Sequence, residues 1–187
     1  MSSRLFAFAG CTSGAWRVTD ARCIVGEPLL PVSHLQVCPA QSLSAKPPPV
    51  WVLRGITSNE RYITAEEKGQ LVAIQQGLGR PHSTRAALIP IRKTAAWWAL
   101  SQDARRAVFE ERSNHVKIGL KHLPPVARRL HHCRDLSETE PFDFLTWFEY
   151  AASYEQQFND LVADLRASEE WKYVDREIDI RLVRTDA

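Results

Sequence analysis

The histidine at position 115 has the type and the placement to bind a metal or a cofactor. It falls on the apolar stripe of a helix that the spacing predicts over residues 102–123, together with Val108 and Ile118. Gly119 follows one turn later, so a flat ligand would have room beside the imidazole. The same pattern also fits the commoner case of a core histidine that is hydrogen-bonded to a backbone carbonyl.

Arg128 and Glu149 are charged residues on the apolar faces of two predicted strands. In the strand over residues 126–134, alternation places Arg128 among aliphatic side chains, and in the strand over 144–150 it places Glu149 on the same face as Trp147. A buried charge costs free energy unless it has a partner, so each residue would need one. An arginine that reaches solvent and a glutamate at a solvated strand end explain the two patterns about equally well.

Gln75 is a polar residue on the apolar face of a further predicted helix. This helix begins with a capping box formed by Thr64 and Glu67 and is predicted to end near residues 77–79. The side chains that we expect to be buried on this face are Leu71, Ile74, Gln75 and Leu78. As an amide, Gln75 would also be satisfied by a backbone group.

An imidazole, a carboxylate bound to its second nitrogen and a separate buried arginine form a combination that suits haem chemistry. The imidazole can ligate the iron, the carboxylate makes the imidazole a stronger electron donor, and the arginine attracts an anion to the opposite side of the ring. A zinc site is the poorer alternative. His131, His132 and Cys133 are neighbours on one strand, so they point alternately to opposite faces.

The elements that carry these residues follow a definite order in the second part of the chain. Strands are predicted at residues 87–93, 126–134, 144–150 and 178–182. Helices are predicted at residues 102–123 and 154–168. Residues 85–187 therefore predict a βαββαβ unit of the ferredoxin-like α+β class, with an antiparallel sheet covered by two helices on one face.

The first part of the chain, residues 1–84, predicts a truncated ferredoxin-like half that is rich in strands. These strands are expected at residues 4–9, 16–25 and 50–56. A surface connection with three consecutive prolines is expected at residues 39–49, because proline lacks the backbone donor that a central strand needs.

Composition excludes several classes of protein. The chain has 187 residues and is 44% hydrophobic, which is enough for a substantial core. Its formal net charge of +2 is far below that of a protein that binds chiefly to nucleic acid. The apolar runs are far shorter than the roughly 20 residues of a membrane span. Four cysteines without metal-site spacing, and no recognisable export signal, predict free thiols and a cytoplasmic location.

Four segments of the chain resemble the chlorite dismutase family. They are TRAALIPIRKTAAWW (84–98), RSNHVKIGLKHLPPVARRLHHCRDL (112–136), PFDFLTWFEY (141–150) and EEWKYVDREIDIRL (169–182). The resemblance extends through nearly the whole chain. Within the family, the chain is similar to the short, dimeric branch. It implies the dimeric α/β-barrel superfamily, bound haem b and a homodimer.

The resemblance also implies roles for individual residues. His115 corresponds to the proximal ligand of the haem iron, Glu149 to the carboxylate hydrogen-bonded to that ligand, and Arg128 to the distal arginine. Gln75 corresponds to a glutamine that holds this arginine in one pose. Asn114 departs from the family, since close relatives often carry a second histidine there, but the ligand position itself is kept.

The cofactor contacts implied by the resemblance are Lys93 and Trp97, which correspond to residues that hold the haem propionates, and Tyr62 as a further propionate contact. The implied reaction converts the anion chlorite into chloride and dioxygen, with chlorite detoxification as the expected role. Coproheme decarboxylases of the same superfamily are an alternative, but they carry a tyrosine where this chain has Ile89, and they lack the distal arginine. A haem carrier or sensor is a second alternative, and it would have no use for a buried Arg128.

Overall fold

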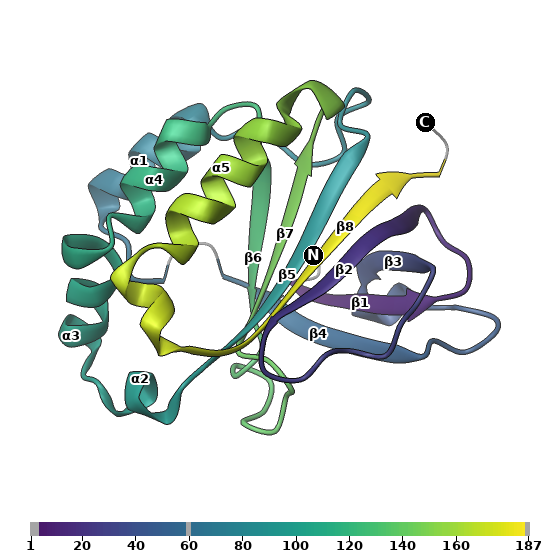
Figure 1. The fold of residues 1–187 in the computed structure, drawn as a ribbon, viewed down its shortest axis with the longest axis horizontal. Helices are drawn as coiled ribbons and strands as arrows, with labels where there is room; N and C mark the ends of the chain where they lie inside the picture. Colours follow the sequence, from purple (N-terminus) through teal and green to yellow (C-terminus); the bar gives the residue numbers. More distant parts are fainter. Residues whose placement is uncertain (1–3, 59–60, 186–187) are drawn as a thin grey trace.

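The structure is a computed structural model, and it describes residues 4–58 and 61–185 (Figure 1). The strands are β1 (Leu5–Cys11), β2 (Trp16–Val25), β3 (His34–Pro39), β4 (Trp51–Thr57), β5 (Arg85–Lys93), β6 (Ala127–His132), β7 (Phe144–Tyr150) and β8 (Val174–Arg184). The α-helices are α1 (Ala65–Ile74), α2 (Ala95–Ala99), α3 (Gln102–Arg106), α4 (His115–His122) and α5 (Glu155–Arg166). A π-helical segment, η2 (Ala107–Arg112), follows α3, and the 3-10 turns are η1 (Ala40–Ser42), η3 (Ala152–Tyr154) and η4 (Glu169–Tyr173).

The strands form a closed antiparallel barrel in the order β1-β3-β2-β8-β5-β7-β6-β4. This confirms the predicted α+β class with an antiparallel sheet. The barrel closes where β4 pairs with β6, with Ile56 opposite His132 and Thr57 opposite His131. Gly55 permits this approach, because a Cβ atom at that position would lie 2.8 Å from the Cβ atom of His131.

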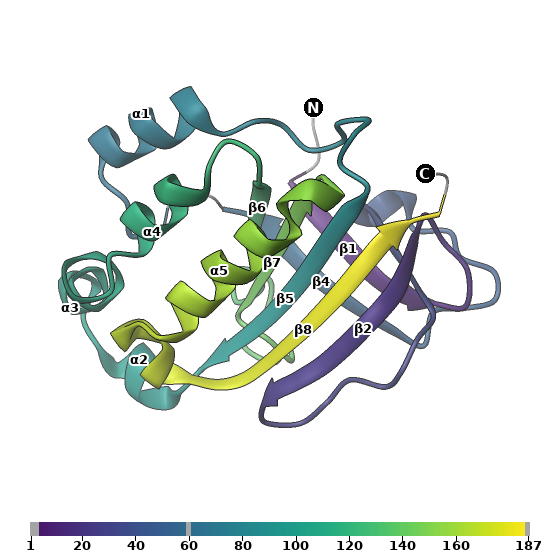
Figure 2. The same cartoon turned by 45° about the horizontal axis from the view of Figure 1, so that its top comes forward.

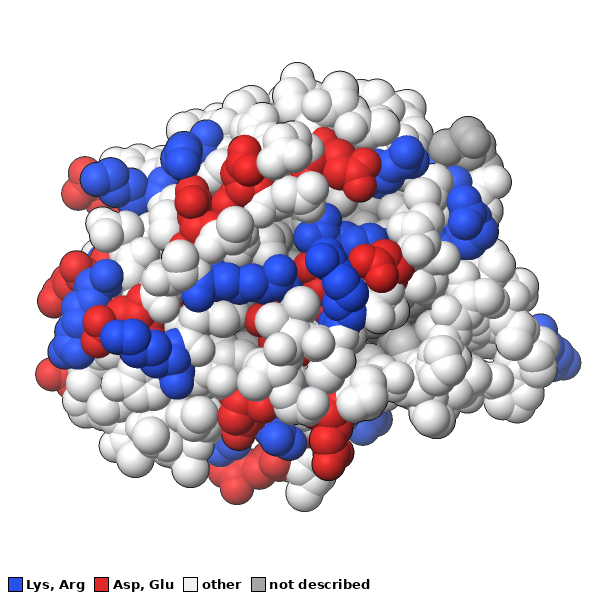
Figure 3. All heavy atoms as spheres, in the orientation of Figure 1, with Lys and Arg blue, Asp and Glu red and all other residues white. Residues whose placement is uncertain are grey.

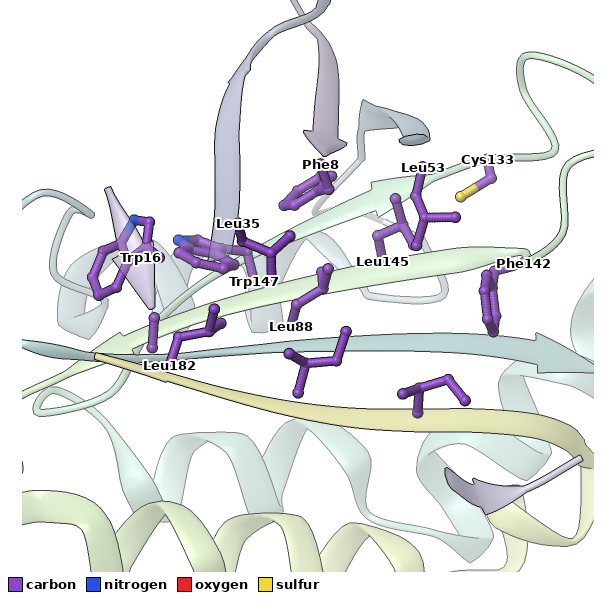
Figure 4. Close-up of a cluster of buried hydrophobic side chains, with 13 residues drawn as sticks. Phe8, Trp16, Leu35, Leu53, Leu88, Cys133, Phe142, Leu145, Trp147 and Leu182 are labelled. Atoms are coloured by element: carbon purple, nitrogen blue, oxygen red, sulfur yellow. The ribbon is translucent and has the colours of Figure 1, made fainter. Parts of the chain in front are cut away.

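The inner face of the barrel is a hydrophobic core. Leu88 of β5 and both Leu145 and Trp147 of β7 point inward and pack with Phe8 and Trp16 (Figure 4). Each of these side chains is almost fully buried, and burial of one large apolar side chain contributes about 1.5–3 kcal/mol. This core makes the barrel a rigid support for whatever lies on its outer face.

The outer face of the second half of the barrel is covered by helices. Figure 2 shows α5 lying along the strands, with α1, α3 and α4 beside it on the same side of the molecule. The alternate residues of the strands, such as Ile89 of β5 and Phe148 of β7, pack here against Phe158 and Leu161 of α5. Side chains therefore alternate along each strand, with one set in the barrel core and the other in the layer between the sheet and the helices.

The predicted continuous helix over residues 102–123 is wrong. The chain passes from α3 through the π-helical segment and then breaks at Asn114, whose φ of 52° lies in the left-handed region. Asparagine adopts this conformation more readily than most residues. The hydroxyl of Ser113 beside it accepts a hydrogen bond from the backbone N–H of Glu170, 2.8 Å away. The break starts α4 at His115 itself.

Helix α1 differs from its prediction at its end. The capping box of Thr64 and Glu67 is confirmed, with both reciprocal hydrogen bonds formed. The helix ends at Ile74 instead of near residues 77–79, and of the four side chains expected to be buried only Leu71 is fully so. Ile74 is 41% exposed, because α1 lies at the edge of the helical layer.

Strand β3 and helix α2 have no counterpart among the predicted elements. β3 lies directly before the proline-rich connection, and α2 is too short to show a helical period. The surface carries Lys and Arg side chains interspersed with Asp and Glu over the face shown in Figure 3. In the part of the chain that the structure describes, no helix has the length and apolar character needed to span a membrane.

Candidate active site

A large cavity lies between the helical layer and the outer face of the barrel. It encloses about 1190 Å³ of space, including its open mouth, so it can hold a large cofactor. Its walls are mostly apolar and come from β5, β6 and β7 on the sheet side and from α4 and α5 on the helix side. The polar and charged side chains among its lining residues are few: Arg61, Tyr62, Lys93, His115, His122, Arg128, Thr146 and Glu170.

His115 enters this cavity from the start of α4. Its Nδ1 atom lies 2.7 Å from Oε2 of Glu170, and its ring stacks on Phe109 with centroids 4.2 Å apart. Since a carboxylate only accepts hydrogen bonds, Nδ1 carries the proton and the lone pair is on Nε2. The predicted open space at Gly119 is confirmed, because a Cβ built there would meet no atom within 4 Å other than the backbone of its own helix and its chain neighbours. The imidazole is therefore oriented as a metal ligand.

Glu170 is the buried carboxylate that sets the state of His115. Its Oε1 atom lies 2.7 Å from the ammonium nitrogen of Lys93, and its backbone N–H donates to Ser113. Burial alone would raise the pKa of Glu170, but the charges and hydrogen bonds of Lys93 and His115 lower it to about 2. Glu170 is therefore an anion throughout the neutral pH range.

The predicted pairing of Glu149 with His115 is wrong. Glu149 lies inside the barrel, where it accepts hydrogen bonds from Nε1 of Trp147 at 2.9 Å and from the backbone N–H of Gly79 at 2.6 Å. The prediction that Glu149 and Trp147 share a face holds, but that face is the barrel core and not the cavity. Glu170 takes the role instead, from a short 3-10 turn whose sequence has no periodic signal.

The predicted role of Lys93 as a propionate contact is also corrected. Its side chain is 3% exposed, its ammonium is paired with Glu170, and it lies over the rings of Trp97 and Trp171 at 4.6 and 5.5 Å from their centroids. A charge that is enclosed in this way is not available to a second carboxylate at the cavity mouth. Lys93 therefore belongs to the His115 side of the site.

Trp97 and Tyr62, the other two expected propionate contacts, both line the cavity, and their contact with a propionate stays a prediction. Their rings form a T-shaped contact with centroids 5.8 Å apart. Nε1 of Trp97 is buried and has no acceptor among the described residues. Tyr62 has a φ of 63°, an uncommon conformation for a residue other than glycine. A buried N–H donor without an acceptor fits a ligand that brings an oxygen, such as a carboxylate.

Arg128 enters the cavity from the sheet side, on β6. Alternation along this strand places Val126, Arg128, Leu130 and His132 on one face, and the first three of these line the cavity. Burial lowers the pKa of the guanidinium, which nevertheless stays charged at neutral pH. Among the residues that the structure describes, no hydrogen bond or ion pair engages this guanidinium. An unpaired cation in a mainly apolar cavity is a binding site for an anion.

Gln75 supports Arg128 through the backbone. Its Nε2 atom donates a hydrogen bond to the carbonyl oxygen of Arg128, 2.7 Å away. The predicted contact was with the arginine in its working pose, whereas this bond fixes the main chain that carries the side chain. Gln75 is the C-cap residue of α1, so this hydrogen bond ties the helix to β6.

The residues of the cavity fit a haem better than a metal held by protein alone. His115 provides a single ligand through its free Nε2, since Nε2 of His122 lies 3.4 Å from Asp164. Within residues 4–58 and 61–185 no cluster of three or more His, Cys, Asp or Glu side chains could hold a metal ion. The remaining ligands would have to come from the cofactor. His131 and His132 do not contribute, since the first is in the barrel core and the second contacts Asp135.

Comparisons with known proteins point in one direction. The family model for chlorite dismutase matches residues 41–185. The solved structure of the dimeric chlorite dismutase from Nitrobacter winogradskyi is 53% identical, with a TM-score of 0.88, and the match covers 96% of this chain and 99% of that one. A chlorite dismutase structure from Candidatus Nitrospira defluvii is 26% identical, with a TM-score of 0.57 over 82% of this chain and 58% of that one.

A further relative matches this chain over only part of its own length. The chlorite dismutase of Ideonella dechloratans is 32% identical over 126 residues, which make up 65% of this chain and 40% of that protein. This chain therefore matches well under half of the length of that relative.

Proposed function

Because this chain belongs to the chlorite dismutase family, we propose that it is a haem b-dependent enzyme that converts chlorite into chloride and dioxygen. One observation carries this proposal. The cavity combines an oriented imidazole on the helix side, at His115, with an unpaired guanidinium on the sheet side, at Arg128. The first suits an iron ligand, and the second suits a small oxyanion.

His115 would hold the cofactor through Nε2. Glu170 keeps the proton on Nδ1 and increases the electron donation of the ring, while Lys93 takes up part of the negative charge of Glu170. Trp97 would donate its free indole N–H to a cofactor carboxylate. When bound, haem supplies a redox-active iron at which the oxygen atoms of chlorite are rearranged.

Arg128 would bind the substrate and retain its fragments. A guanidinium presents several N–H donors in one plane, so it can hold chlorite and then the chlorine-containing fragment until dioxygen and chloride leave. The surrounding wall of aliphatic and aromatic side chains excludes water and strengthens this attraction. Gln75 fixes the backbone from which the Arg128 side chain extends.

The other candidate activities lack support from the cavity. Ile89 lines the cavity with an aliphatic side chain at the position where coproheme decarboxylases carry a tyrosine. A haem carrier or sensor would need only the His115 side of the site, and Arg128 would then be a buried charge without purpose.

We also propose a homodimer and a barrel made of two ferredoxin-like halves, at residues 1–84 and 85–187. The match to a dimeric chlorite dismutase along 99% of its chain supports the dimer. The division into two halves is supported by the strand order of the barrel, in which β1 to β4 lie side by side as β4-β1-β3-β2 and β5 to β8 lie side by side as β6-β7-β5-β8. The cytoplasmic location and the detoxifying role stay predictions of the sequence.

The experiment that tests the function is an oxygen measurement on the haem-loaded protein. The protein is expressed with haem supplied, its Soret band is recorded, and chlorite is added in an oxygen-electrode cell. We expect one dioxygen and one chloride per chlorite consumed. A protein that binds haem but consumes chlorite without releasing dioxygen contradicts the proposal.

A further inference from the structure

Arg61 is a cavity-lining cation without a role in the site described so far. It lies in the loop between β4 and α1, directly before Tyr62, and lines the same cavity as Trp97. Its Nε atom is buried and has no hydrogen-bond acceptor among the described residues. Nε1 of Trp97 is in the same condition. Two buried N–H donors without acceptors therefore line one cavity.

The guanidinium of Arg61 also pairs with a carboxylate outside the cavity lining. Its Nη2 atom donates to Asp135, in the loop between β6 and β7, and the same carboxylate lies 3.0 Å from Nδ1 of His132. Asp135 thus neutralises part of the charge of Arg61 and orients the guanidinium while its Nε–H remains unused. This is the arrangement of a donor that has been positioned for a further acceptor.

We infer that Arg61 binds a carboxylate of the tetrapyrrole, together with the indole N–H of Trp97. The inference rests on the proposed function and adds a residue to it. A propionate is the acceptor that matches both donors, because its two oxygens can accept from both N–H groups at once. A charge-assisted hydrogen bond of this kind is roughly twice as strong as a neutral one. Arg61 would therefore contribute to cofactor affinity in addition to His115.

A tetrapyrrole with blocked carboxylates separates this role from a structural one. Apoprotein is titrated with haemin and with haemin dimethyl ester, and both affinities are measured for the wild type, R61A and R61Q. We expect R61A and R61Q to weaken haemin binding by about tenfold or more and to leave ester binding unchanged. Far-UV circular dichroism checks that each variant is folded.

Arg54 provides a matched control. It also pairs with a carboxylate of the loop between β6 and β7, with 2.8 Å between its Nη2 atom and Oε1 of Glu140, but it does not line the cavity. We expect R54A to change neither affinity. The second supporting variant is D135N, which should weaken haemin binding by less than R61A does, because Asp135 orients the guanidinium whose Nε–H the propionate would accept from.

The outcomes separate the inference from the proposed function. Equal losses for haemin and its ester in both Arg61 variants would make Arg61 a structural residue and overturn the inference, while haem binding by the wild type stands. Unchanged binding of both tetrapyrroles, with a raised KM for chlorite in the loaded R61A variant, would assign the guanidinium to the substrate anion and also overturn it. A wild-type protein that binds neither tetrapyrrole contradicts the proposed function itself.

Discussion

Glu170 is shared between His115 and a cation, and this sets how strongly it can act on the imidazole. Its two oxygens are 2.7 Å from Nδ1 of His115 and 2.7 Å from Nζ of Lys93. The ammonium lowers the basicity of the carboxylate, so the proton stays on the imidazole and the ring gains only part of the imidazolate character. The electron donation at Nε2 is therefore tuned by two residues, one of which never touches the histidine.

The substitution Glu170→Gln tests this arrangement at a single residue. A neutral amide no longer supports negative charge on the imidazole, so we expect the reduction potential of bound haem to rise, by about 59 mV for each tenfold change in relative affinity for the two iron states. Glu149→Gln is the control and should leave the potential unchanged, because Glu149 lies in the barrel core. If Glu149→Gln shifted the reduction potential and Glu170→Gln did not, Glu149 and not Glu170 would be the partner of His115.

The substitution His115→Ala tests the iron ligand. Alanine is a good helix former, so α4 should form as before, but the protein's bond to iron is lost. We expect a folded protein with most of its haem absent, measured from the ratio of Soret to protein absorbance. Full haem content with an unchanged spectrum would show that His115 is not the ligand.

The break before α4 is the element-level feature on which the site depends. An uninterrupted helix would continue the stripe of α3, whereas the left-handed residue at Asn114 starts a new helix axis at His115. The π-helical segment before it and the Ser113 contact with Glu170 place this turn against η4, which brings Glu170 to the imidazole. Irregular backbone of this kind is frequent at functional sites.

Substitutions at Asn114 should reveal the cost of this backbone. Asn114→Ala forces a less suitable residue into a positive φ, and we expect a loss of about 1 kcal/mol in the free energy of unfolding. Asn114→Gly should be close to neutral because glycine adopts this conformation freely. Urea unfolding of the two variants provides the comparison, and equal stability of the alanine and glycine proteins would argue against strain at this position.

The elements with a clear local period could be predicted from the sequence, but the distant residues that their side chains contact could not. Alternation placed Arg128 and Leu130 on one face, and that face lines the cavity, because the direction of a strand side chain is a local property. Alternation also grouped Glu149 with Trp147 correctly, but the choice of the cavity face depends on where distant helices pack. Glu170 is 55 residues from His115 and lies in a short 3-10 turn, so no spacing rule connects them.

At the scale of the whole molecule, two buried histidines make stability depend on pH. The pKa of His131 is lowered to about 4 by burial and by the charge of Arg129, and that of His132 is lowered to about 4 by burial and by the charge of Arg61. Arg129 donates to Nε2 of His131, so the other ring nitrogen donates to the carbonyl of Leu145. Both hydrogen bonds are made by the neutral imidazole.

The folded-state pKa of each histidine lies below the ordinary value of 6.5, so the unfolded chain binds protons more readily as pH falls. Their contribution to stability is complete above pH 6.5 and is lost between pH 6.5 and about 4. We expect the free energy of unfolding to fall by a few kcal/mol over this window. His131→Gln should reduce the slope, and the same change at exposed His82 should not. A wild-type stability that is flat over the window contradicts this assignment.

Two neighbouring arginines on β6 point to opposite faces of the barrel wall, one toward the candidate site and one toward the barrel core. Arg128 faces the cavity, whereas Arg129 points into the barrel, where it lies 3.8 Å from the ring centroid of Phe6 and bonds to His131. The proposed function requires the charge on the cavity face only. We therefore claim that Arg128 binds the substrate anion while His115 holds the haem.

The most direct test of that claim is the rate of dioxygen release from chlorite by haem-loaded Arg128→Ala, with Arg129→Ala as the matched control. We expect Arg128→Ala to keep its Soret band and to lose roughly one to three decades of turnover, if the guanidinium contributes about 1.5–4 kcal/mol to the transition state. Arg128→Lys should recover part of the loss, and a folded Arg129→Ala protein should keep the wild-type rate. An Arg128→Ala protein that releases dioxygen at the wild-type rate, for as many turnovers, would contradict the account.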